Sequence, residues 1–142
     1  MEEPIGYIVK QLQHALRTAM DRKLRTHGLT TPQYSALTTL AAVDELSGAE
    51  LARRTFVTAQ TMNGILVNLE TAGLVTRRPD PADARVLRAE LTATGRARLD
   101  ACDEAVKAIE RQMLGNLRPE EQPWLRDALR RCVTALSTTT VQ

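Results

Sequence analysis

The chain has 142 residues, of which 43% are hydrophobic and 25% charged, and its formal net charge is +2. A chain of this length buries roughly 68–70% of its unfolded surface, so it needs no metal or disulfide to fold. Two cysteines are too few for a disulfide framework or a zinc site, and no run of 18 apolar residues occurs to span a membrane. The first ten residues lack the apolar stretch of a secretory signal. We therefore expect a cytoplasmic protein with no membrane partner, no metal and no cofactor.

The first third of the chain carries two helical patterns. Apolar residues recur at steps of three and four and predict a helix over about residues 5–25. Gly28 ends it, because glycine adopts the left-handed conformation that follows many helices. A second helix begins near Thr31, where Pro32 suits the first helical position, and it ends before Ser47.

The next segment predicts a helix-turn-helix. Ser47 and Glu50 have the spacing of a capping box, which predicts a short helix to about Arg54. A turn over residues 55–57 follows, and Thr58 caps a second helix that runs to residue 72. In DNA-binding proteins of this kind the second helix lies in the major groove.

Two short β-like runs follow the helix-turn-helix. Residues 74–78 and 86–91 flank a turn signal at residues 80–83, and together they predict a β-hairpin. The predicted fold class is therefore mainly α with a small β-hairpin, a winged helix-turn-helix.

The C-terminal third predicts a long helix after Thr92 and a last helix opened by residues 119–121. Two interpretations of their apolar stripes stay open, an intrachain core and a dimer interface. We favour the dimer, because two long helices have too little partner surface inside one small chain. The predicted interface residues lie on or beside the apolar stripes of the first helix and the last two helices: Ile8, Leu12, Val106, Ile109, Trp124, Leu125 and Leu129.

The candidate DNA-binding residues are polar side chains near the start of the second helix and arginines around it. Glutamine and asparagine suit adenine edges, and Asp83 stands two residues before Arg85, where it can direct that guanidinium into the narrow minor groove. A solvated charged hairpin, an exposed helix face and an ordinary turn are the alternatives for these groups. The full set is Arg53, Arg54, Thr58, Gln60, Thr61, Asn63, Arg77, Arg78, Asp83, Arg85 and Arg88.

These segments in order resemble the MarR (multiple antibiotic resistance regulator) family. The matching motifs are Glu50-Leu51-Ala52, the run from Leu69 to Val75, the Asp-x-Arg wing within residues 77–85, and the Leu-Thr-x-x-Gly entry at residues 91–95. The resemblance implies a bacterial homodimer that binds double-stranded DNA at a palindromic operator, with a small-molecule effector and Arg85 in the minor groove. It implies a dimerisation region over residues 1–30 and 93–142 and a DNA-binding region over residues 31–92. Tyr34 is our guess for a wall of the effector pocket.

One departure from the family concerns the second helix of the helix-turn-helix, the recognition helix over residues 58–72. Neither this helix nor the residues that flank it, from Thr55 to Thr76, include a lysine or an arginine. This bareness favours an alternative, a winged-helix dimer that binds protein or binds DNA without sequence preference. An enzyme is the third hypothesis and ranks last, because we find no nucleophile–base pair, phosphate loop or metal spacing. Cys102 and Cys132 lie on apolar stripes, so we expect both to pack rather than to sense oxidants.

Overall fold

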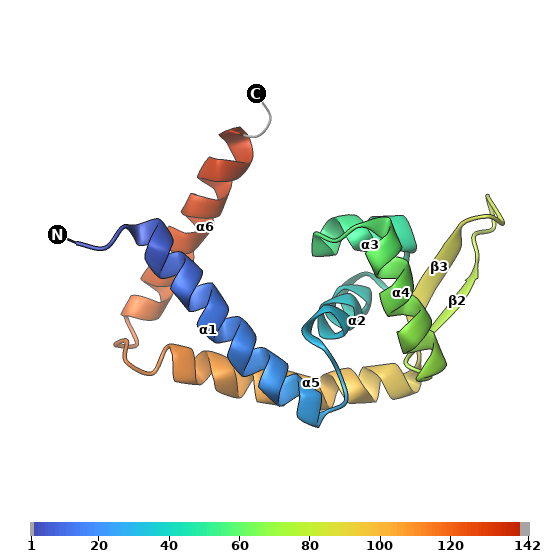
Figure 1. The fold of residues 1–142 in the computed structure, drawn as a ribbon, viewed down its shortest axis with the longest axis horizontal. Coiled ribbons are helices and arrows are strands. Elements are labelled where there is room, and N and C mark those ends of the chain that lie inside the picture. Colours follow the sequence, from blue (N-terminus) through green and yellow to red (C-terminus); the bar gives the residue numbers. More distant parts are fainter. Residues whose placement is uncertain (1, 140–142) are drawn as a thin grey trace. The chain divides into compact units, whose positions relative to one another are not determined.

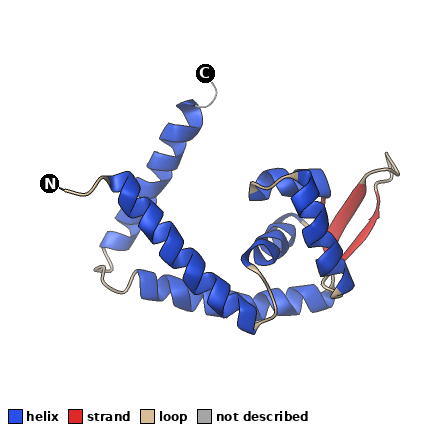
Figure 2. Cartoon of the chain, viewed as in Figure 1, coloured by secondary structure: helices blue, strands red, loops and turns tan. Residues whose placement is uncertain are grey.

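The computed structural model describes residues 2–139 of the chain. It forms two compact units, one ending at Lys107 and one beginning at Ala108. The elements in chain order are α1 (Ile5–Thr26), α2 (Thr31–Val43), β1 (Glu45–Ser47), α3 (Gly48–Thr55), α4 (Ala59–Thr71), β2 (Val75–Pro79), β3 (Leu87–Leu91), α5 (Ala93–Met113) and α6 (Glu121–Thr139). The predicted order of helices and the predicted hairpin are confirmed (Figure 2).

The small sheet contains one strand more than predicted. β1 pairs with β3, and β3 pairs with β2, both antiparallel, in the order β1-β3-β2. Helix α2 ends at Val43, before Ser47 as predicted, and Asp44 takes a φ of 68°. The strand β1 that follows it was not predicted. A three-residue strand carries no readable period, and only its partner β3 makes it a strand.

Helix caps explain where the helix-turn-helix begins and ends. The Ser47 hydroxyl accepts a hydrogen bond from the Glu50 N–H at 3.2 Å, which confirms the cap of α3. The Thr58 hydroxyl accepts from the Thr61 N–H at 3.0 Å and caps α4 in the same way. A complete reciprocal capping box occurs instead at α2, between Thr30 and Gln33, where the sequence analysis did not place one.

The core of the first unit lies where α2, α3, α4 and the sheet meet. Its fully buried side chains include Leu37, Leu51, Leu66 and Leu69. Leu99 and Cys102 of α5 belong to the same core, and Val106 packs against it. The first part of the α5 stripe is thus intrachain core, and the place of Val106 in a dimer interface stays a prediction.

The start of α5 is tied to the turn that follows α4. The Thr92 N–H donates to the Leu74 carbonyl at 3.1 Å, and the Thr92 hydroxyl donates to the Gly73 carbonyl at 2.7 Å. The same hydroxyl accepts from the Gly95 N–H at 2.9 Å. A Cβ on Gly95 would overlap the Leu74 carbonyl oxygen and lie 2.9 Å from the carbonyl carbon. The Leu-Thr-x-x-Gly motif therefore supplies a cap and a close backbone approach.

The turn between α3 and α4 is strained at Phe56. This residue has a φ of 62° and a ψ of 37°, the left-handed region, yet its side chain is 95% exposed. A left-handed non-glycine residue costs about 1–3 kcal/mol, and an exposed aromatic ring returns little packing energy to offset that cost.

Replacing Phe56 with glycine is therefore expected to raise the free energy of unfolding by about 1 kcal/mol, the relief of strain less the added entropy of the unfolded chain. Urea denaturation followed by circular dichroism measures the change. Phe56→Ala is the matched control, because it removes the ring and keeps the strained Cβ, and it should stay near wild type. A glycine variant no more stable than the alanine variant contradicts the account.

Candidate nucleic-acid interface

Helix α4 buries one face and leaves the other to solvent. Met62, Leu66 and Leu69 are fully buried against α2 and α3. Thr58, Gln60 and Thr61 are exposed at the start of the helix. Arg53 and Arg54 lie in the last turn of α3 and are also exposed. The structure thus places five predicted contact residues at solvent on the two helices of the helix-turn-helix.

The wing is the β2–β3 hairpin, which extends from the helical part of the first unit beside α4 (Figures 1 and 2). The Asp80 N–H donates to the Val86 carbonyl at 2.8 Å, and the Val86 N–H donates to the Asp83 carbonyl at 2.9 Å. The Asp80 carboxylate also accepts from the Ala82 N–H at 2.7 Å. The Asp and Pro residues of the tip therefore form a defined turn through backbone and carboxylate hydrogen bonds.

Arg85 at the wing tip is held by Asp83, as the sequence predicts. Its Nε lies 3.2 Å from Asp83 Oδ1, and the same carboxylate oxygen accepts from the Arg85 backbone N–H at 3.1 Å. These hydrogen bonds, the side-chain one foremost, hold the pKa of Asp83 below its ordinary value. The pair therefore persists above that ordinary pKa and is lost as the pH falls through the lowered one. The Arg85 side chain is nevertheless 92% exposed, so Asp83 orients the guanidinium and leaves it accessible to solvent.

Arg78 and Arg88 face each other across the β2–β3 register, an unfavourable pairing of like charges. Glu45 of β1 separates them: its carboxylate lies 2.9 Å from Arg78 Nη2 and 2.8 Å from Arg88 Nε. Arg88 also contacts Asp80 at 3.2 Å and is only 23% exposed. Hydrogen bonds from Arg78 and then Arg88 lower the pKa of Glu45. To bind DNA, Arg88 would have to leave its carboxylate partners, whereas Arg78 is 63% exposed and pairs with Glu45 and Glu90 at the surface.

Sequence reasoning missed the acidic partners of the wing arginines. Glu45 and Asp80 were not singled out, and Glu50 lies 4.0 Å from Arg88. The available signal was the register: once β1 is known, Ser47 stands opposite Arg88 and Glu45 stands opposite Glu90. Without β1 the carboxylates had no assignable neighbour.

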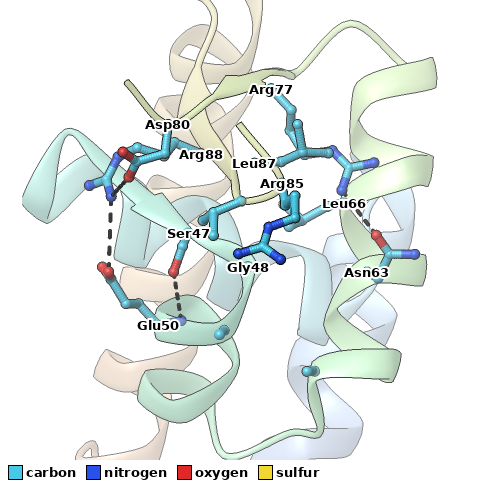
Figure 3. A pocket seen from close by; sticks show the side chains of 13 residues that line it. Ser47, Gly48, Glu50, Asn63, Leu66, Arg77, Asp80, Arg85, Leu87 and Arg88 are labelled. Atoms are coloured by element: carbon cyan, nitrogen blue, oxygen red, sulfur yellow. Dashed lines mark hydrogen bonds and ion pairs between the residues drawn. The ribbon is translucent and has the colours of Figure 1, made fainter. Parts of the chain in front are cut away.

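Arg77 does not point away from the protein either. Its side chain is 11% exposed, and its guanidinium contacts α4, with Nη1 3.0 Å from Asn63 Oδ1 and Nη2 3.3 Å from Glu70 Oε1. The Asn63, Arg77 and Arg85 side chains line one groove of about 530 Å³ between α4, the start of α3 and the wing (Figure 3). This groove joins the recognition helix to the wing in a single surface.

The predicted dimer residues differ in exposure. Ile8, Leu12, Trp124 and Leu129 are exposed apolar side chains, whereas Ile109 is 7% exposed in the single chain. Val106 and Leu125 are half-buried. Further exposed apolar residues accompany the first group on α1 and α6: Ile5, Val9, Val133 and Leu136. Apolar surface on this scale on two helices is typical of a protein interface.

Tyr34 of α2 donates a hydrogen bond from its hydroxyl to Asp103 Oδ1 of α5 at 2.7 Å. Burial first, and then the Asp103 carboxylate, raise the pKa of Tyr34 to about 12. A pocket wall at Tyr34 stays a prediction; the hydroxyl proton is already engaged, so a ligand there would meet an oxygen that accepts.

Replacing Tyr34 with phenylalanine is expected to lower the free energy of unfolding by about 1 kcal/mol through the lost hydrogen bond. Because the folded-state pKa is raised, the difference between the proteins should be constant below pH 10 and shrink as the pH rises towards 12. Denaturation at a series of pH values measures it. A difference that grows above pH 10 would contradict the Tyr34–Asp103 bond.

Cys102 is buried, as predicted, and burial raises the pKa of its thiol. Cys132 is exposed, so the packing expected of it does not occur within the single chain. Within residues 2–139, no cluster of three His, Cys, Asp or Glu side chains could hold a metal ion. None of the helices in the same range is long and apolar enough to cross a membrane.

Comparison with known proteins agrees with this geometry. Residues 27–86 match a family model described as the MarR family. The HTH-type transcriptional repressor Rv2887 of Mycobacterium tuberculosis is 37% identical over 121 residues, which cover 85% of this chain and 87% of that protein. A crystal structure of Rv2887 in complex with DNA is 34% identical with a TM-score of 0.80, covering 92% of this chain and 98% of that chain. A second, in complex with salicylic acid, is 35% identical with a TM-score of 0.75 and covers 92% and 97%.

Proposed function

This chain belongs to the MarR family, and from that membership we propose that it is a homodimeric repressor that binds a palindromic operator through α4 and the wing. The observation that carries the proposal is Arg85, which is fixed by Asp83 at the wing tip and is 92% exposed. It shares a groove with the recognition helix. A cation aimed from a narrow hairpin suits the minor groove, while the helix occupies the major groove.

Nine of the eleven predicted contact residues, all but Asn63 and Asp83, divide into two groups under this proposal. Arg53, Arg54, Thr58, Gln60, Thr61 and Arg85 are exposed and reach DNA directly. Arg77, Arg78 and Arg88 are engaged with acidic or amide groups of the protein. We assign these three to holding the wing and α4 in place. The N–H groups at the start of α4 add a phosphate site.

The dimer follows from the exposed apolar residues of α1 and α6, which a second copy would cover. Two recognition helices of a dimer must reach successive major grooves, about 34–36 Å or a multiple apart. We keep residues 1–30 and 93–142 as the proposed dimerisation region and residues 31–92 as the DNA-binding region.

A small-molecule effector is part of the proposal because a relative has been solved with salicylic acid as well as with DNA. An effector acts only if it binds one spacing of the two recognition helices better than the other. In this proposal the protein binds DNA and the effector without catalysing a reaction on either. A regulator of bacterial genes acts on DNA in the cytoplasm, and we propose that location for this protein.

The proposal is tested by titrating the purified protein against its own upstream DNA and a scrambled duplex at one physiological salt concentration. A specific regulator should bind its own upstream DNA more tightly than the scrambled duplex, by a factor on the order of 10³ or more. Equal and weak binding to both duplexes would favour the alternative, a winged-helix dimer that binds protein or DNA without sequence preference. The observation that favours this alternative is the absence of lysine and arginine from Thr55 to Thr76.

A further inference from the structure

The contact between Arg77 and α4 has a consequence for base recognition. Asn63 and Glu70 are seven residues apart, so they lie two turns apart on one face of α4. The Arg77 guanidinium contacts both, with Nη1 on the Asn63 amide oxygen at 3.0 Å and Nη2 on Glu70 at 3.3 Å. The Arg77 side chain is only 11% exposed, so its guanidinium is mostly covered by the protein itself.

The chemistry of arginine fixes which way the Asn63 amide is turned. A guanidinium has five N–H donors and no acceptor, so the group of Asn63 that faces it must be the carbonyl oxygen. The amide nitrogen, Nδ2, then lies on the side away from Arg77 (Figure 3). Asn63 is itself exposed, and over residues 2–139 no side chain accepts a hydrogen bond from Nδ2.

A free asparagine and a turned asparagine differ in the base that they recognise. Free asparagine pairs with adenine by two bonds, accepting from N6 and donating to N7. The oxygen keeps a second lone pair, but it is turned towards Arg77, so the groups of Asn63 that face away from Arg77 are its two N–H donors. In the major groove, guanine presents two acceptors side by side, O6 and N7, whereas cytosine presents a donor.

We infer that Arg77 is a positioning residue that turns the N–H donors of Asn63 towards the DNA, so that Asn63 selects a guanine edge rather than the adenine expected of asparagine. The inference rests on the proposed function, because it assumes that α4 lies in the major groove. It replaces our expectation from sequence that Asn63 suits adenine. Arg77 contributes to specificity without touching a base.

The test is selection from a randomised duplex library by the intact wild-type dimer and its variants, with sequencing of the bound DNA. Wild type should enrich guanine at one base pair of each half-site by at least about fivefold. Asn63→Ala should lose that enrichment and leave the other positions as they were. Arg77→Met, which keeps the apolar stem and removes the donors, should change the preferred base there to adenine.

Two further variants keep the inference falsifiable. Arg77→Lys retains one donor for the amide oxygen and should keep guanine. If Arg77→Met does not fold, Asn63→Asp replaces it, because a carboxylate still accepts from Arg77 but has no N–H, and its guanine enrichment should vanish. Melting curves report folding of every variant.

The outcomes separate the inference from the proposed function. A wild-type protein that enriches no sequence overturns the proposed function and the inference with it. A wild-type protein that enriches an operator but prefers adenine at the Asn63 position overturns the inference alone. The same holds if a folded Arg77→Met variant keeps guanine, because a merely structural arginine would weaken binding without changing the base.

Discussion

Replacing Arg85 with alanine is expected to weaken binding to the operator by ~1–3 kcal/mol at each half-site while leaving the melting temperature unchanged. The side chain is 92% exposed, and among the described residues it forms hydrogen bonds and an ion pair with Asp83 alone, so its loss removes nothing from the core. Its value lies in the minor groove, where a cation meets the strongest negative potential of the duplex. Titration of a labelled operator duplex at fixed salt measures the change.

Two variants distinguish a directed arginine from a mere charge. Arg85→Lys keeps the charge and loses the planar fork, so it should recover part of the affinity. Arg96→Ala removes an exposed arginine of α5 outside the candidate interface and should bind like wild type. If Arg85→Ala and Arg96→Ala bind equally well, the wing has no part in recognition.

The largest effect on stability is expected from Gly95→Ala, about 3 kcal/mol or more of lost free energy of unfolding. The added methyl group would overlap the Leu74 carbonyl oxygen, which is backbone and cannot rotate away. Moving α5 to make room would also stretch the Thr92 hydrogen bonds to Leu74 and Gly73. Chemical denaturation measures the loss.

Gly64→Ala is the matched control on another helix. A Cβ on Gly64 meets no atom within 4 Å, so the substitution relieves a helix-interior glycine without a clash. It should stabilise the protein by about 1 kcal/mol. Opposite signs for the two substitutions support the close approach at Gly95, whereas a Gly95→Ala variant as stable as wild type contradicts it.

The sequence predicts the helices and the wing because their signals are local. The Thr58 hydroxyl caps α4 by accepting from the N–H of Thr61, three residues further along the chain, and Asp83 contacts Arg85 two residues away. Such contacts depend on spacing along the chain alone, so they can be read from the residues. The Leu-Thr-x-x-Gly motif was also readable, although its physical reason, the approach of Gly95 to Leu74, was not.

The contacts that decide the roles of the arginines join distant residues. Arg88 meets Glu45 across 43 positions, and Arg77 meets Asn63 across 14. Neither pair has a spacing rule, because both depend on how β1, the wing and α4 pack. For the same reason the sequence counted Arg77, Arg78 and Arg88 with Arg85, although only Arg85 is almost fully exposed.

The central claim, that the wing lies in the minor groove beside α4 in the major groove, is tested most directly by cutting DNA from the wing tip. Cys132 is replaced by serine, Cys102 is buried, and a cysteine at the exposed position Ala84 carries an iron chelate that releases hydroxyl radicals. Radicals released in the minor groove cut the two strands at positions offset towards their 3′ ends, flanking the operator half-sites. The account predicts this pattern at both wings. Cuts offset towards the 5′ ends, or spread evenly along the duplex, would contradict it.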